Sequence, residues 1–153
     1  MVQEKNMKKY EVYKSMNENL TKAMRSEFYY QAIFIEYAII EDRCTSVLRH
    51  AGVKYLDSKG NEFKISEKLR RMRGNPAFLV PFVQQRITPE LLDEIIEWKR
   101  ERDQLIHALA KIPYDHESIK ATAITGQELI KKLSSKVRSV NAYYDTLTQN
   151  SIK

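Results

Sequence analysis

The chain has 153 residues, of which 42% are hydrophobic and 30% charged, and it carries a net charge of +6. This size fits one domain with its own hydrophobic core, so we expect a single domain over residues 1–153 with no second catalytic domain. Few glycines and prolines favour a helical protein, and the single cysteine excludes both an internal disulfide framework and a four-cysteine zinc site.

Two helices are predicted in the first third of the chain. Apolar residues recur at three- and four-residue steps from Lys8 to Met24, and again from Phe28 to Ala51. This spacing is the period of an amphipathic helix. We therefore expect a helix over each range, with a break near Ser26.

The next segment combines a turn with a short basic helix. Residues 57–61 read Asp-Ser-Lys-Gly-Asn, which is turn chemistry and predicts a short hairpin within residues 55–65. A helix is expected over residues 66–73, where the Gly-Asn-Pro that follows stops it.

A connector and a longer helix follow. Residues 77–86 are apolar but short and contain a proline, so we expect a buried connector. Thr88 and Pro89 are typical of the N-cap and the first position of a helix, and Glu90 is favourable near its positive end. This helix is expected to run to about Lys111.

The last helix should be the longest. It is predicted to begin near His116 or Ser118, and its apolar residues continue to Leu147 at alternating steps of four and three. Such a seam packs along a partner helix over its whole length. The predicted fold is all-α, an antiparallel bundle of four to five helices with a short turn or hairpin insertion.

The charge and the ends of the chain bear on its partners and location. The N-terminus is polar, and no stretch approaches the roughly 20 apolar residues of a membrane span. We therefore expect a cytoplasmic protein with no membrane partner. The positive charge favours an acidic partner, but solvated basic faces explain it equally well. The candidate RNA-binding residues are Lys64, Lys68, Arg70, Arg71 and Arg73.

The run from residue 98 to residue 107 is the most suggestive chemically. It places Arg102, Asp103 and His107 within about one and a half helical turns. Arginine offers fixed donors to an anion, histidine moves protons near neutral pH, and a carboxylate orients either group. The run is therefore a compact set of groups for chemistry on phosphate.

The helical wheel assigns these charges to unusual positions. The expected core arc of this helix consists of Leu92, Ile95, Ile96, Ile106, Leu109 and Ala110. Lys99 and Arg102 fall inside it, and Asp103 lies at its edge. His107 shares a face with Asp103 but lies about 140° around the helix from Arg102. The two groups cannot aim at one point from a single helix, which favours a site shared at an interface.

Glu41 is a second apparent anomaly. It stands within an apolar pattern of the second helix formed by Tyr30, Phe34, Tyr37, Cys44 and Leu48. We expect Glu41 to pair with Arg102 or Lys99, or to face an interface. The alternative is a buried ion pair that only sets the helix register.

Other chemistries are not indicated. The paired Glu-x-x-His motifs of a di-iron bundle, a phosphate-binding loop and a nucleophile elbow are all missing from the sequence. Cys44 lies on a core stripe and is interpreted as a packing residue. We expect neither a metal nor a cofactor.

The motif Arg102-Asp103-x-x-x-His107 resembles the signature of the HEPN superfamily. That signature is an arginine, usually a polar residue next to it, and a histidine about four to six positions further on. It lies on a late helix of an all-helical bundle, as here. The resemblance therefore covers the motif and most of the expected architecture.

The resemblance implies a metal-independent endoribonuclease, toxin-like or defence-like, that acts on single-stranded RNA as a homodimer. Arg102 would hold the scissile phosphate, His107 would transfer protons and Asp103 would orient both, with Glu41 and Lys99 as supporting charges. Some members are paired with an antitoxin protein that modifies a tyrosine two positions after the histidine. Leu109 stands there in this chain, which puts that route of control in doubt.

Two readings without catalysis remain open. One is a helical dimerisation or interaction protein, in which Arg102, Asp103 and Glu41 form a structural charge network. The other is a module that binds RNA or a nucleotide without cutting it.

Overall fold

A computed structural model describes residues 2–111, 113 and 115–151 of the chain. Within these residues it contains six α-helices and one 3-10 turn, and its strand pairing is limited to an isolated bridge between Leu56 and Glu62. The elements are α1 (Val2–Arg25), α2 (Tyr29–His50), α3 (Ile65–Gly74), η1 (Pro76–Phe78), α4 (Pro81–Gln84), α5 (Pro89–Ala108) and α6 (His116–Ser151). The predicted all-α class, with its small hairpin insertion, is confirmed.

Helices α1 and α2 form a hairpin around a tight turn. Glu27 has a positive φ of 59°, and the N–H of Phe28 donates to the carbonyl of Ala23 at 2.9 Å. The predicted break near Ser26 is confirmed. Helix α1 begins earlier than expected, at Val2, because the polar residues before its apolar pattern include several strong helix formers.

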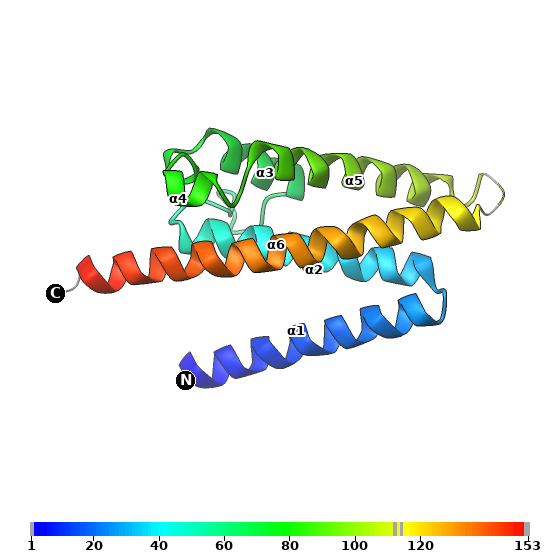
Figure 1. Cartoon of the computed structure of the whole chain (residues 1–153), viewed down its shortest axis with the longest axis horizontal. Helices are drawn as coiled ribbons and strands as arrows, with labels where there is room; N and C mark the ends of the chain where they lie inside the picture. The colour runs from blue at the N-terminus through cyan, green and yellow to red at the C-terminus, as the bar shows by residue number, and fades with distance from the viewer. Residues whose placement is uncertain (1, 112, 114, 152–153) are drawn as a thin grey trace.

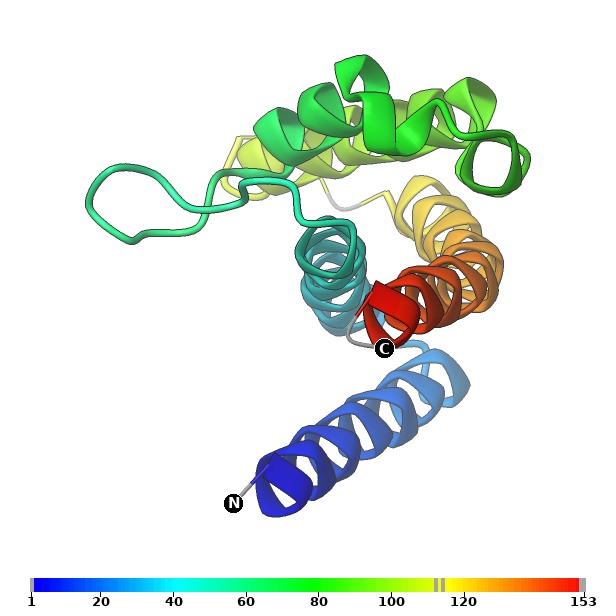
Figure 2. The same cartoon turned by 90° about the vertical axis from the view of Figure 1, so that its left-hand side faces the viewer.

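Helices α2 and α6 lie side by side in the middle of the molecule (Figures 1 and 2). The Nδ2 of Asn141 donates to Ser46 at 3.0 Å, and His50 lies 2.7 Å from Asp145 one turn further along both helices. Because the residue numbers rise together, α2 and α6 run parallel. Consecutive long helices are antiparallel, as predicted, but this central pair is not.

The remaining helices cover this central pair on two sides. Helices α3, α4 and α5 lie on one side and α1 lies on the other (Figure 2). Near its N-terminal end α1 diverges from the bundle, and residues 3–12 are exposed, including the large apolar Met7 and Tyr10. No described helix is both long enough and apolar enough to cross a membrane.

The predicted connector has more structure than expected. Residues 77–86 contain most of η1 and all of α4, and a proline occupies the first turn of each helix. Phe78 and Val83 are buried, but Leu79 is exposed, so the connector is only partly buried. After it, the Thr88 hydroxyl accepts a hydrogen bond from the N–H of Leu91 at 3.1 Å, which confirms the predicted N-cap of α5.

Candidate functional site

Trp98 fixes how α5 is rotated about its axis. Its side chain is buried, and its Nε1 donates to the carbonyl of Thr122 on α6 at 2.9 Å. The buried side of α5 is formed by Leu91, Leu92, Ile95 and Trp98. Ile96 and Leu109 are exposed, so the core arc predicted for this helix was partly wrong.

Asp103 joins the two neighbouring cations. Its Oδ2 accepts a hydrogen bond from Lys99 Nζ at 2.7 Å, and its Oδ1 accepts one from Arg102 at 2.8 Å. Burial alone would raise the pKa of Asp103, but these two hydrogen bonds outweigh burial and hold the pKa below its usual range. Asp103 is therefore an anion held between two cations.

Arg102 faces α2. Its guanidinium carbon lies 4.1 Å from the ring centroid of Tyr37 and 5.7 Å from that of Phe34. Only 16% of its side chain is exposed, and its buried Nε has no hydrogen-bond partner in the described part of the chain. Burial is the main factor that raises the pKa of Tyr37, and the charge of Glu41 adds to it. Arg102 is thus largely engaged within the fold.

His107 lies on another side of α5. It is exposed and lines a groove of about 350 Å³ between α3 and α5, together with Lys99 and Asp103. Helix α3 contributes Ser66 and the buried Leu69 to this groove. Arg102 does not line it. The chain therefore separates Arg102 from His107, as the wheel predicted.

Glu41 does not make the predicted contact. It lies 3.4 Å from the ammonium of Lys68, not in an ion pair with Arg102 or Lys99, and it is partly exposed. Lys68 also donates to Glu62 at 2.8 Å, and Glu62 accepts from Thr45 at 3.0 Å. The predicted pairing with Arg102 or Lys99 was wrong because Glu41 faces α3 at the rim of the core, where its partner is Lys68. That Glu41 faces an interface stays a prediction.

The basic residues of α3 do not all face solvent. Lys68 is fully buried, so the prediction that it contacts RNA was wrong. Arg70 and Arg71 both donate to Glu67, and Arg73 donates to Asp93 of α5. Lys64 is exposed at the N-cap of α3. Four of the five predicted RNA-binding residues therefore remain at the surface.

Among the described residues the core encloses one carboxyl, that of Glu36, which the sequence-based predictions did not include. Glu36 on α2 is fully buried, and neither carboxyl oxygen has a hydrogen-bond partner in the described structure. Burial raises the pKa of this group to about 9. The absence of a side chain at Gly126 on α6 makes room for it. The helical spacing could have predicted its burial. Glu36 lies three residues after Ile33 and four before Ile40, both buried, and therefore on the same face of α2.

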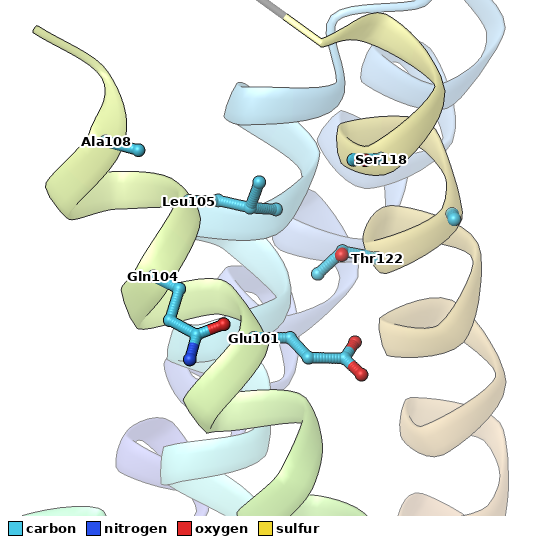
Figure 3. Close-up of a pocket in the computed structure, with 7 residues that line it drawn as sticks. Glu101, Gln104, Leu105, Ala108, Ser118 and Thr122 are labelled. Atoms are coloured by element: carbon cyan, nitrogen blue, oxygen red, sulfur yellow. The ribbon is translucent and has the colours of Figure 1, made fainter. Parts of the chain in front are cut away.

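A second groove lies on the far side of α5, against α6 (Figure 3). It has a volume of about 440 Å³, and Glu101 and Leu105 point into it from α5 while Thr122 faces them from α6. None of the predicted site residues lines it. Among the described residues, no cluster of three or more metal-ligating side chains is present. Cys44 is buried and its burial raises the pKa of the thiol to about 12, consistent with a packing role.

The chain was also compared with known proteins. No family model matches it, and searches of curated proteins and of solved structures found no match.

Proposed function

We propose that the chain is a metal-independent endoribonuclease of the HEPN type that cuts single-stranded RNA as a homodimer. The observation that carries the proposal is the exposed His107 in the α3–α5 groove, with Lys99 and Asp103 beside it. The groove offers a cation for phosphate and a proton carrier at one place. A second cation of α5, Arg100, also lines this groove.

In this proposal the ribose 2′-oxygen attacks the adjacent phosphorus and the 5′-oxygen leaves. One histidine takes the 2′-hydroxyl proton and another gives a proton to the leaving oxygen, so that two His107 side chains would act in one cleft. Arg102 would stabilise the charge that develops on the phosphate. Asp103 would hold Arg102 and Lys99 in place, as it does in the monomer.

A dimer is part of the proposal because one chain holds the two groups apart. An isologous interface places the same surface next to itself and would bring Arg102 of one copy near His107 of the other. Light scattering should show a dimer whose dissociation depends on concentration. A monomer at all concentrations would exclude the composite site.

The catalytic test is cleavage of single-stranded RNA in EDTA. Cleavage should leave a 2′,3′-cyclic phosphate, and RNA with a 2′-O-methyl group at the cut should resist. His107→Ala should lose at least about 10²-fold in rate, and Arg102→Lys should lose about 10²-fold because a point charge replaces a fork of donors. Arg138→Gln is the matched control, since Arg138 is an exposed arginine on α6 and does not line the α3–α5 groove.

The salt dependence of binding separates the basic residues from the chemistry. Neutralising Arg70 and Arg71 should weaken RNA binding most at low salt and leave the chemical step intact. A parent protein that cuts no RNA, or a His107→Ala variant that cuts as well as the parent, would overturn the nuclease proposal.

A second candidate is a helical interaction or RNA-binding module without catalysis. The observation in its favour is the engagement of Arg102, which is mostly buried over Tyr37 and bonded to Asp103. If this candidate holds, Arg102→Lys should lower stability and leave no catalytic effect to measure. We propose a cytoplasmic location under either candidate, and under the nuclease proposal an antitoxin protein is a further expected partner.

A further inference from the structure

An exposed phenylalanine lies beside Arg102. Phe34 on α2 is 49% exposed, although its neighbours along the helix at Ile33 and Tyr37 are buried or half-buried. A lone exposed apolar residue is common on protein surfaces and needs no explanation. The surroundings of Phe34 distinguish it from such a residue.

Arg102 is fixed next to the ring. Its guanidinium donates a hydrogen bond to Asp103 Oδ1 at 2.8 Å. The guanidinium carbon lies 4.1 Å from the centroid of the Tyr37 ring. The guanidinium covers the Tyr37 ring, whereas it lies 5.7 Å from the Phe34 centroid, at the margin of a cation–π contact. The Phe34 ring therefore keeps exposed surface beside a positioned cation.

The charge of this surface favours a nucleic acid over an apolar protein partner. Asp103 is shared by two cations, Lys99 and Arg102. Glu41, the other carboxylate whose charge acts on Tyr37, lies 3.4 Å from the Lys68 ammonium. The whole chain carries a charge of +6. Single-stranded nucleic acids are bound by such combinations, in which bases stack on aromatic rings and arginine planes while cations contact the phosphates.

We propose that Phe34 is a stacking platform for one base of single-stranded RNA, with Arg102 at its edge on the adjoining phosphate. This inference rests on the proposed function, because it takes RNA as the ligand. It adds a binding residue on α2, outside the Arg102-Asp103-x-x-x-His107 motif. Stacking tolerates any base, so Phe34 would contribute affinity without sequence preference.

Fluorescence anisotropy with an end-labelled single-stranded RNA tests the binding step apart from cleavage. To prevent cutting, the RNA carries 2′-O-methyl groups throughout. Phe34→Ala should weaken binding by about 5- to 150-fold, the range for losing one stacked base. Phe34→Leu, which keeps apolar surface without a ring face, should weaken it nearly as much, and Phe34→Trp should restore it. Phe28→Ala is the matched control, because Phe28 is also exposed, at 62%, and precedes the same helix.

The outcomes separate this inference from the nuclease proposal. If the parent binds RNA without cutting unmodified RNA and Phe34→Ala weakens binding, the platform stands and the nuclease fails. If the parent cuts RNA but Phe34→Ala and Phe34→Leu bind like the parent, the platform is overturned and the nuclease stands. The stacking platform is also overturned if Phe34→Ala binds RNA like the parent but self-associates more weakly in sedimentation. That result would assign Phe34 to a contact with a second copy of the chain. A parent that neither binds nor cuts RNA overturns both.

Discussion

Glu36 gives the sharpest test of the fold, because the core encloses it without a partner. Its pKa is raised to about 9 from an ordinary value of 4.5 by burial. We predict that Glu36→Gln, which keeps the shape of the protonated acid, stabilises the protein at neutral pH and removes one component of its pH dependence.

The magnitude follows from the two pKa values. Below about pH 4.5 the carboxyl is protonated in the folded and unfolded states, and it adds no pH dependence. Between 4.5 and about 9 only the folded state holds the proton, so the free energy of unfolding falls by about 1.4 kcal/mol per pH unit as pH rises. The loss reaches roughly 3 kcal/mol at pH 7 and roughly 6 kcal/mol above pH 9.

Urea unfolding followed by circular dichroism, at several values between about pH 5 and about pH 8, measures this slope. The difference in stability between Glu36→Gln and the parent should grow by about 1.4 kcal/mol per unit. Glu128→Gln is the matched control, since Glu128 is exposed on α6 and should leave the slope unchanged. Parallel curves for the parent and Glu36→Gln would refute a neutral, buried Glu36.

Two further predictions concern groups packed in the core. Gly126→Ala should lower the free energy of unfolding by about 1–3 kcal/mol or more, because the added Cβ would lie 2.6 Å from the Glu36 Cδ. Gly74→Ala is the control, since a Cβ added there meets no atom within 4 Å. Glu62→Gln should cost about 1–3 kcal/mol, since Glu62 is the closest partner of the buried Lys68 ammonium. Lys68→Met leaves no buried charge and should cost about 1 kcal/mol or less. Urea unfolding measures each value, and a larger loss for Lys68→Met than for Glu62→Gln would contradict this account of the ion pair.

The positions of the helices could be predicted because their signals are local. The N-cap at Thr88, the break near Ser26 and the periodic apolar residues act within one or two turns, and the predicted N-cap and break were confirmed. The parallel arrangement of α2 and α6 has no such local signal. It depends on how α3, α4 and α5 return the chain across the central pair, which is a property of packing between distant segments.

The candidate site was harder to predict because aromatic residues misplaced the core arc of α2. The apolar pattern includes Phe34 and Tyr37, so the predicted core side of α2 contains Glu41 and leaves Glu36 outside it. In the structure Phe34 is exposed and Glu36 is buried. For a large aromatic ring, size and hydrophobicity alone do not decide the side of the helix on which it lies, since such rings also pack at the margin of a bundle.

Trp98 makes the centre of the molecule optically visible. It is the single tryptophan of the chain, and its indole nitrogen lies within 2.8 Å of the point where a Cβ on Gly126 would stand, next to the Glu36 carboxyl. Its emission therefore reports from one known place, where α2, α5 and α6 meet. Ionisation of Glu36 would put a negative charge beside the indole and shift the emission while the chain is still folded. One spectrum would thus distinguish a change of charge in the core from unfolding, which would expose the indole to water.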